Sequence, residues 1–324
     1  MASGLEQQYI VPPFSVLDSK QGYWQKRKRS WLNIGIESEV GRGENLLKFS
    51  DTINQVKTNS YGQCFNKLNE DKFNKVESRI SNGTSIFDPV LCEICYKWFC
   101  PKGGSIFDPF AGGSVRGIVA GKLGYPYTGI ELSENQVIAN REQAIKLSPD
   151  IKPDWIIGDS RKSGILLPVD KMYDLIFSCP PYYDLEVYSS RVDDMSNASS
   201  YKDFLLMYGA SMRAAIDRLR NNRFMIYVVT NIRDKKGFYR DFVSDTISLA
   251  AQNGLHLYND IILVNCVGTL ALRINGQFPK YRKVGKMHQN ILVFYKGDDP
   301  KQISSEFDEI KSLDEMQNSL NKWS

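Results

Sequence analysis

Two short motifs and two separate acidic residues carry the residue types that could do chemistry in this sequence. The first motif, FDPFAGGS, begins at Phe107, places Asp108 before two adjacent glycines and ends at Ser114. Small residues of this kind let the backbone approach a ligand closely. Glu131 and Asp159 each end a later apolar segment, where a carboxylate can bind ribose hydroxyls or an amino group.

The glycine loop lacks both common phosphate-binding signatures. It contains no Gly-Lys-Ser/Thr of a P-loop, and it has only two adjacent glycines in place of the dinucleotide fingerprint. A ligand that has a ribose and an amino group but no pyrophosphate fits the acidic residues. This pattern predicts S-adenosylmethionine as the cofactor.

The second motif is Cys-Pro-Pro-Tyr, which follows the apolar segment YDLIFS and comprises Cys179, Pro180, Pro181 and Tyr182. Two consecutive prolines cannot continue a central strand, so they predict a rigid loop at the carboxyl edge of a sheet. A residue before proline is also conformationally restricted, which fixes the direction of the Cys179 side chain. An aromatic ring stands directly beside it.

Alternating strands and helices must position these motifs. From residue 105 to residue 297, short apolar segments alternate with helical patterns, and this order predicts an α/β fold with a doubly wound, mostly parallel sheet. The segments LHLYNDIILVN and QNILVFYKG are expected to be neighbouring strands joined by a long basic excursion. A helix is expected at Pro89 with Asp88 as its cap, and another over residues 238–254.

Composition limits the class of protein. The chain has 324 residues and a formal net charge of +4, with 41 Lys plus Arg against 37 Asp plus Glu. A hydrophobic content of 42% is typical of globular proteins and excludes collagen-like, disordered and coiled-coil classes. No apolar run approaches the roughly 18 residues that span a bilayer, and MASGLEQQYI lacks the features of a signal peptide. We expect a soluble cytoplasmic protein with no membrane partner.

Three of the six cysteines lie close together, at Cys92, Cys95 and Cys100. They have no matching second pair for a zinc site, and both histidines are far away in the sequence. The segment LCEICYKWFC is typical of a buried helical face, where a free cysteine packs as a small hydrophobic residue. We therefore expect these cysteines in the core, and no metal site.

Together the motifs resemble those of the S-adenosylmethionine-dependent amino-methyltransferases of DNA, which modify N6 of adenine or N4 of cytosine. FDPFAGGS is similar to their cofactor motif, CPPY to their catalytic motif, and SIFDPVLCE to an extra cofactor motif of some subgroups. The flanks, including KMHQNILVFYKG, resemble phage and prophage modification enzymes. The resemblance covers residues 84–297 and implies a Rossmann-like methyltransferase fold, in a bacterial or phage-encoded protein.

The resemblance also implies a role for each motif residue. Cys179, Pro180, Pro181 and Tyr182 would be catalytic, with Tyr182 stacking on a target base flipped out of double-stranded DNA. The cofactor's methionine part would contact one group of residues: Phe87, Asp88, Asp108, Phe110 and Gly112. Glu131 would bind its ribose and Asp159 its adenine amino group.

Two basic clusters with interleaved aromatic residues predict contacts with DNA, since cations hold phosphates and rings stack on bases. The first cluster stands beside Tyr23, Trp24 and Trp31 and comprises Lys26, Arg27, Lys28 and Arg29. The second surrounds Phe278 and Tyr281 and comprises Arg273, Lys280, Arg282, Lys283 and Lys286. Each cluster alone could equally be a solvated surface.

The positions of the motifs and of the basic clusters predict three parts of the chain. Residues 1–84 would be a basic and aromatic extension with a polar linker, 85–298 the methyltransferase domain and 299–324 a tail. Target recognition would fall to loops at about 185–203 and 266–287. The oligomeric state is left open between a monomer and a homodimer.

Cys179 departs from the family's pattern, which has Asp, Asn or Ser at the first position of the catalytic motif. A thiol is a weak hydrogen-bond acceptor, so the Pro180 carbonyl would be the main acceptor for the hydrogens of the target amino group. Asp184 is an alternative acceptor. The substitution leaves the target atom open, with N6 of adenine favoured over N4 of cytosine. An RNA base, a protein glutamine or a non-catalytic DNA-binding role are the competing hypotheses.

Overall fold

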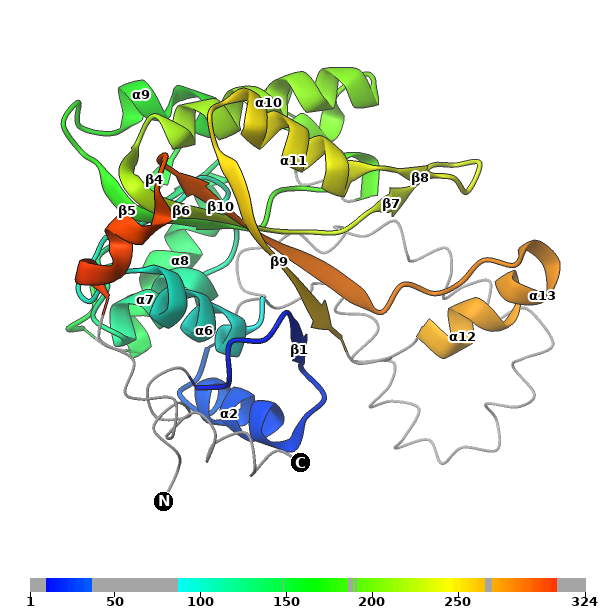
Figure 1. Ribbon diagram of the computed structural model, residues 1–324, viewed down its shortest axis with the longest axis horizontal. Coiled ribbons are helices and arrows are strands. Elements are labelled where there is room, and N and C mark those ends of the chain that lie inside the picture. Colours follow the sequence, from blue (N-terminus) through cyan, green and yellow to red (C-terminus); the bar gives the residue numbers. More distant parts are fainter. Residues whose placement is uncertain are drawn as a thin grey trace.

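The computed structural model describes residues 10–36, 87–147, 149–185, 189, 191–265 and 270–307 (Figure 1). Its centre is an eight-stranded sheet in the order β4-β3-β2-β5-β6-β10-β9-β1. The strands of this sheet are β1 (Val16–Asp18), β2 (Ile106–Asp108), β3 (Tyr127–Glu131), β4 (Asp154–Ile157), β5 (Tyr173–Ser178), β6 (Leu219–Val229), β9 (His256–Val264) and β10 (His288–Lys296). The polar linker of residues 37–84 lies outside the described residues.

The sheet is mostly parallel, as expected. β2 pairs in parallel with β3 and β5, β3 with β4, and β5 with β6. Only β10 runs against its neighbours, pairing antiparallel with β6 and β9. From β2 the chain winds outward through β3 and β4, and it then returns to β5 on the other side of β2. The strand order therefore reverses between β2 and β5, where ligands bind in open α/β sheets.

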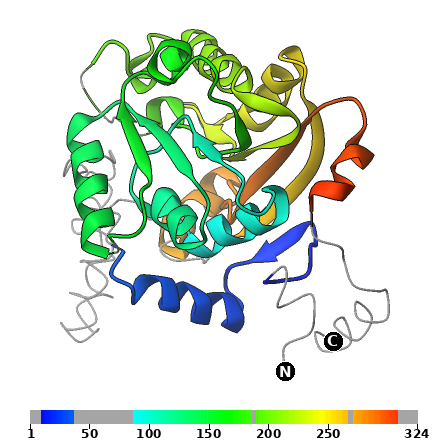
Figure 2. The same ribbon diagram turned by 90° about the vertical axis from the view of Figure 1, so that its left-hand side faces the viewer.

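Helices cover both faces of the sheet (Figures 1 and 2). The helices are α2 (Gly22–Leu32), α6 (Pro89–Phe99), α7 (Val115–Lys122), α8 (Glu134–Leu147), α9 (Ser163–Leu166), α10 (Tyr201–Ile216), α11 (Phe242–Gln252), α12 (Leu270–Asn275) and α13 (Gln277–Tyr281). One core cluster joins α2, α6, α7 and α8 to one sheet face, and a second joins α10 and α11 to the other. Short 3-10 turns complete the chain at η1 (Ser160–Lys162), η2 (Tyr183–Leu185), η3 (Met195–Asn197) and η4 (Pro300–Glu306).

Local sequence explains where these elements begin. Asp88 caps α6 by accepting the Val90 N–H at 2.9 Å, and Pro89 is the first helical residue, as predicted. Ser133 accepts the Gln136 N–H at 3.3 Å at the start of α8. These caps fix the starts of α6, which precedes β2, and of α8, which follows β3.

The N-terminal segment is part of the sheet and its helical layer. β1 adds a parallel edge strand to β9, with Val16 opposite Ile262, and α2 packs against α6. Trp24 is fully buried in the resulting core. Residues 10–36 are therefore integral to the fold that contains the predicted methyltransferase segment.

The sequence predicted a helix over residues 238–254, and the predicted start of this helix is wrong. Tyr239–Arg240 forms β8, which pairs antiparallel with β7 (Ile232–Arg233), and α11 begins only at Phe242. The turn between the two strands contains Gly237 at φ +96°, and the Asp234 N–H donates to the Phe238 carbonyl at 2.8 Å. Glycine adopts this left-handed conformation without strain, which favours a hairpin turn over a continuous helix.

Candidate active site

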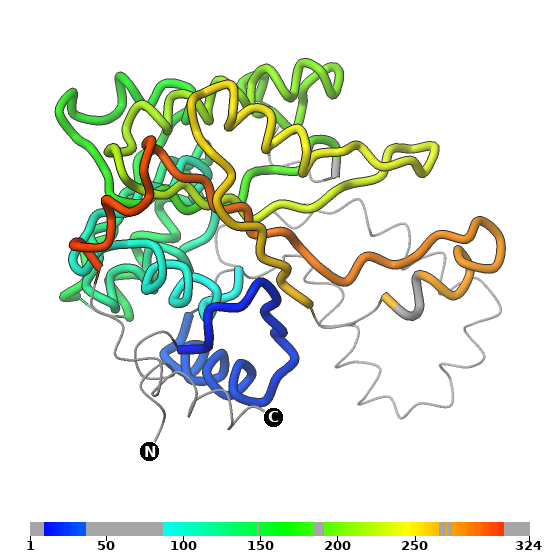
Figure 3. Tube along the Cα trace, viewed as in Figure 1, coloured from blue at the N-terminus to red at the C-terminus, as the bar shows by residue number. Residues whose placement is uncertain are grey.

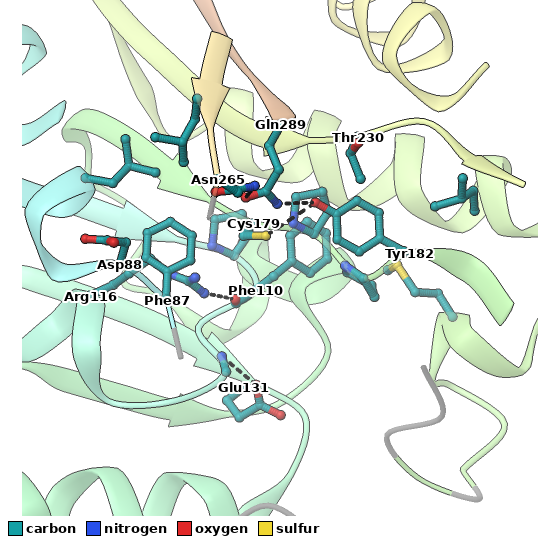
Figure 4. Close-up of a pocket in the computed structure, with 18 of the residues that line it drawn as sticks. Phe87, Asp88, Phe110, Arg116, Glu131, Cys179, Tyr182, Thr230, Asn265 and Gln289 are labelled. Carbon is teal, nitrogen blue, oxygen red and sulfur yellow. Dashed lines mark hydrogen bonds between the residues drawn. The ribbon is translucent and has the colours of Figure 1, made fainter. Parts of the chain in front are cut away.

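A cavity of about 880 Å³ lies along the carboxyl ends of the central strands. It runs from the loops after β2, β3 and β4, past the end of β5, to the β7–β8 hairpin and the segment before β10 (Figure 4). Its lining includes nearly all the predicted catalytic and cofactor-binding residues: Phe87, Asp88, Phe110, Gly112, Glu131, Asp159, Cys179, Pro180, Pro181 and Tyr182. The fold thus brings both motifs into one space.

Asp108 is absent from this lining and is fully buried behind it. Its carboxylate accepts hydrogen bonds from Arg116 Nε at 2.5 Å, the Tyr127 hydroxyl at 2.8 Å and Ser178 Oγ at 2.6 Å. The Ser178 contact joins the end of β5 to the end of β2. Asp108 therefore connects β2 and β5, the two strands between which the strand order reverses.

Arg116 is one of the cavity residues that the sequence motifs did not identify. Its Nη2 donates to the carbonyls of Phe110 at 2.5 Å and Ala111 at 2.9 Å, so it braces the glycine loop from α7. Burial alone would lower the pKa of Arg116, but the Asp108 carboxylate raises it above its usual value. One sequence signal could have revealed Arg116: it lies in the first turn of an otherwise apolar helix, and a buried arginine needs an acidic partner.

The glycine loop is held against β3. Gly112 has φ +52°, a left-handed conformation that favours glycine, and its N–H donates to Glu131 Oε2 at 2.8 Å. Gly129 has no side chain where the loop crosses it, since a Cβ there would lie 2.8 Å from the Ala111 Cβ. Glu131 Oε1 also accepts the Ser133 N–H at 2.8 Å, so its carboxylate is held at the cavity wall.

The two remaining acidic residues of the cofactor set occupy separate positions on the wall. Asp88 accepts Lys28 Nζ at 3.0 Å and the Trp24 indole N–H at 3.2 Å. Asp159 caps η1 and forms an ion pair with Arg161 at 2.7 Å. Phe87 lies edge-on to Phe177 with centroids 5.6 Å apart. Each polar group is therefore held by neighbours on its own side of the cavity.

The Cys-Pro-Pro-Tyr motif lies where the strand order reverses, directly after β5. Cys179 Sγ lies 3.8 Å from the Tyr182 hydroxyl, and both point into the cavity (Figure 4). Among the described residues, none donates a hydrogen bond to the Pro180 carbonyl. The Tyr182 ring is 9% exposed and packs edge-on against Phe242 at 5.9 Å.

A polar chain extends from Tyr182 to the opposite wall. The Tyr182 hydroxyl donates to the Val228 carbonyl at 3.3 Å and accepts from Gln289 Nε2 at 3.3 Å. Asn265 Nδ2 in turn donates to Gln289 Oε1 at 3.5 Å. Gln289 lies on β10 and Asn265 just after β9, two positions that the sequence did not mark. Their amides fix the phenol of Tyr182.

Asp184, the alternative acceptor, is turned away from the cavity. Its carboxylate accepts from Arg240 Nη1 at 2.8 Å, and Arg240 also lies over the Tyr183 ring at 4.7 Å. Of the three candidate acceptors, Cys179 and Pro180 line the cavity and Asp184 does not.

Two of the four cations of the first basic cluster are engaged within the fold. Arg27 forms an ion pair with the buried Glu93 of α6, with its Nε 2.6 Å from Glu93 Oε2. Lys28 pairs with Asp88 and lines the cavity. Lys26 and Arg29 are exposed on the same helix.

The second cluster lies on an arm between β9 and β10 that carries α12 and α13 (Figure 3). Lys280 and Arg282 are exposed, together with Phe278 at 45% and Tyr281 at 66%. Arg282 lies over the Phe278 ring at 5.6 Å. The side chain of Arg273 and the recognition-loop residues 186–188, 190 and 266–269 lie outside the described residues.

The β7–β8 hairpin adds basic and aromatic residues that the sequence motifs did not reveal. Lys235 and Lys236 are exposed near its tip, beside Phe238 at 71% exposure. Lys286 of the arm lies 5.9 Å from the Tyr239 ring, so hairpin and arm are neighbours at the cavity wall. Burial lowers the pKa of Lys286, an effect that Asp241 opposes. The sequence analysis missed these basic and aromatic residues because it predicted a helix that began at residue 238.

Cys92, Cys95 and Cys100 are free and buried in the core, as expected. Burial raises the pKa of the Cys92 thiol well above its usual value. Within the described ranges, no group of three or more His, Cys, Asp and Glu side chains could hold a metal ion. No helix in the described part of the chain is long and apolar enough to cross a membrane.

Comparisons with solved structures find several methyltransferases. The chain aligns with TrmN from Thermus thermophilus at 15% identity and a TM-score of 0.43, over 65% of this chain and 49% of that one. A methyltransferase from Pyrococcus furiosus aligns at 18% identity and a TM-score of 0.42, over 65% and 84%. Magnesium protoporphyrin IX methyltransferase from Synechocystis, with bound SAM, aligns at 11% identity and a TM-score of 0.41, over 78% and 100%.

The chain thus spans about half the length of the Thermus protein that it matches. No protein-family model matches the chain, and no curated protein matches its sequence. At such low identities no residue role passes from the matched structures to this chain. The mixed α/β fold with its mostly parallel sheet is established by the strand order itself.

Proposed function

We propose that this protein is an S-adenosylmethionine-dependent methyltransferase that acts on an exocyclic amino group of a DNA base, with N6 of adenine favoured over N4 of cytosine. One observation carries the proposal. The Cys-Pro-Pro-Tyr loop opens into the same cavity as Glu131, the last residue of β3, and Asp159, which follows β4. The acceptor motif and the cofactor-binding residues can therefore serve one reaction.

The residues on the cofactor side fit S-adenosylmethionine chemically. Glu131 offers carboxylate oxygens for ribose hydroxyls, and Asp159 offers an acceptor for the adenine amino group. Phe87, Asp88, Phe110 and Gly112 line the part of the cavity assigned to the methionine portion. When bound, the cofactor supplies an electrophilic methyl group on a sulfonium centre.

The residues of the motif would prepare the amino group. An exocyclic amino nitrogen is a poor nucleophile because its lone pair is delocalised into the ring. The Pro180 carbonyl and the Cys179 sulfur would accept the two amino hydrogens and draw the nitrogen toward tetrahedral geometry. The rigid Pro-Pro backbone holds both acceptors in place, which favours in-line attack.

Tyr182 would provide the stacking surface for the flipped base. Its ring is fixed by Phe242, and its hydroxyl is fixed by Val228 and Gln289. A fixed ring loses little conformational freedom when a base stacks on it. Exposed cations and rings on the arm and the hairpin support double-stranded DNA as the partner, because the same two segments supply Lys286 and Tyr239 to the cavity wall.

Two variants test this assignment. Cys179→Ser should retain substantial methylation, because a hydroxyl accepts a hydrogen bond at least as well in a similar volume. Tyr182→Ala should lower the initial rate about 5- to 150-fold, since stacking on a base is worth about 1–3 kcal/mol. Both rates are measured on one DNA with labelled cofactor.

A covalent mechanism predicts the reverse order. If Cys179 attacked the base as a thiolate, Cys179→Ser would be inactive, and DNA containing 5-fluorocytosine would trap a covalent adduct. A denaturing gel shows whether the adduct forms. An adduct would overturn amino-group methylation.

A further inference from the structure

Lys28 has an unexpected position for a residue of a basic surface cluster. Its ammonium group lies 3.0 Å from Asp88 Oδ2, and both side chains line the cavity together with Ser19 and Gln25. The side chain of Lys28 is 30% exposed and that of Asp88 is 15% exposed. An N-terminal segment that the sequence placed outside the catalytic domain thus forms part of the cavity wall.

Attachment of α2 to α6 does not depend on this ion pair. Arg27 and the Trp31 indole both donate to Glu93, with the Trp31 contact at 2.9 Å. Trp24 is fully buried, and its indole N–H donates to Asp88 at 3.2 Å. Lys28 therefore has no necessary anchoring role, and its charge faces the cavity.

Lys28 is also the more accessible of the two cations on this side of the cavity, with a side-chain exposure of 30% against 6% for Arg116. The lining cations are Lys28, Arg116, Arg233 and Lys286. Arg116 is committed to Asp108 and to two loop carbonyls. Arg233 and Lys286 lie against Tyr239 at the opposite, hairpin end. Arg116 lies 4.7 Å from the Phe87 ring, but its hydrogen bonds to Asp108 and the loop carbonyls are already made, so near Phe87 and Asp88 Lys28 is the cation that remains available for an anionic part of a ligand.

We infer that Lys28 is a cofactor-binding residue whose ammonium group binds the carboxylate of the methionine part, while Asp88 binds its α-ammonium. The inference rests on the proposed function. The methionine part is a zwitterion, and an adjacent Lys–Asp pair presents the complementary arrangement of charges. Without Lys28, the cofactor carboxylate would meet the Asp88 carboxylate and an Arg116 whose charge is already paired with Asp108, which is unfavourable in a partly buried site.

The test compares two ligands by calorimetry: S-adenosylmethionine and decarboxylated S-adenosylmethionine, which keeps the amino group and lacks the carboxylate. The wild-type protein should bind the complete cofactor about 10-fold or more tightly than the decarboxylated one, as for a charge-assisted contact. Lys28→Gln should abolish this preference by weakening only the complete cofactor. Lys28→Arg should retain most of it.

Lys26→Gln is the matched control, because Lys26 is exposed on the same helix. It should bind both ligands as the wild type does. Thermal unfolding of each variant establishes that α2 is still in place.

Two outcomes would overturn this inference alone. A wild-type protein with equal affinity for both ligands does so without any variant. A Lys28→Gln protein that keeps the preference does so too, whether its two affinities are unchanged or fall equally, since Lys28 would then act at most through Asp88 or the fold. A wild-type protein that binds neither ligand contradicts the proposed function as well, so the two failures are distinguishable.

Discussion

The two basic clusters look alike in the sequence but occupy different environments in the fold. On α2, the neighbouring Trp24 and Trp31 are buried, and Arg27 is paired with a buried carboxylate of α6. On the arm, Phe278 and Tyr281 are exposed beside exposed cations. The first cluster therefore joins a helix to the core, whereas the second is open to a partner.

The carboxylates of α6 explain this difference. Glu93 is buried within the apolar segment LCEICYKWFC, and a buried carboxylate requires a hydrogen-bonded cation. Arg27 supplies that cation. Asp88, the N-cap of the same helix, is only partly buried, and its pairing with Lys28 leaves both side chains at the cavity wall. A run of lysines and arginines thus predicts a nucleic-acid surface only after buried acidic residues elsewhere have been assigned their partners.

The largest expected effect comes from breaking the internal ion pair of the first cluster. Arg27→Ala would leave Glu93 buried without its main cation, with Lys97 Nζ 3.8 Å away. Removal of one partner of a buried ion pair costs about 3–5 kcal/mol, and we expect about 3 kcal/mol because the Arg27 side chain is partly exposed. Denaturant unfolding measures this decrease in stability.

Lys280→Ala is the matched control on the arm. Its side chain is exposed, and among the residues described it forms no ion pair, so its free energy of unfolding should change by less than about 0.5 kcal/mol. Equal small decreases in both variants would contradict the distinction between the two clusters.

The next effect concerns DNA affinity. Neutralising Lys280, Arg282 and Lys283 together should weaken DNA binding, and the slope of log affinity against log salt should fall by about 0.9 for each DNA phosphate that these cations neutralise in the wild type. Fluorescence titrations over a range of salt concentrations measure this slope. An unchanged slope would assign these residues to an ordinary solvated surface.

The smallest effect should come from the exposed residues of α2. Neutralising Lys26 and Arg29 removes two charges that have no exposed ring beside them in the described structure, since Trp24 and Trp31 are buried. The salt slope should fall by less than half as much as in the triple variant, under the same titration conditions. A fall as large as that of the triple variant would make the two clusters equivalent.

Elements with strong local patterns could be predicted from the sequence. The alternation of apolar segments and helical patterns predicted the mostly parallel sheet, and the Asp88-Pro89 pair predicted the start of α6. Both motifs were also placed correctly at strand ends, since consecutive prolines cannot continue a strand.

Features that depend on distant parts of the chain could not be predicted in this way. β1 has three residues and is a strand only because it pairs with β9, far along the chain. The buried Asp108–Arg116 pair and the Tyr182–Gln289 hydrogen bond likewise depend on tertiary packing. The hairpin at residues 232–240 was missed because its second strand joins an apolar helical pattern without a break.

Methylation of a base amino group in DNA is the central proposal, and identification of the methylated nucleoside is its decisive test. Purified protein is incubated with double-stranded DNA and S-adenosylmethionine labelled in its methyl group, with Tyr182→Ala as the control, and the DNA is then digested to nucleosides. We expect label in N6-methyl-2′-deoxyadenosine, or in N4-methyl-2′-deoxycytidine if cytosine is the target. Label in 5-methyl-2′-deoxycytidine, or none in DNA from a protein that binds the cofactor, would contradict the proposal.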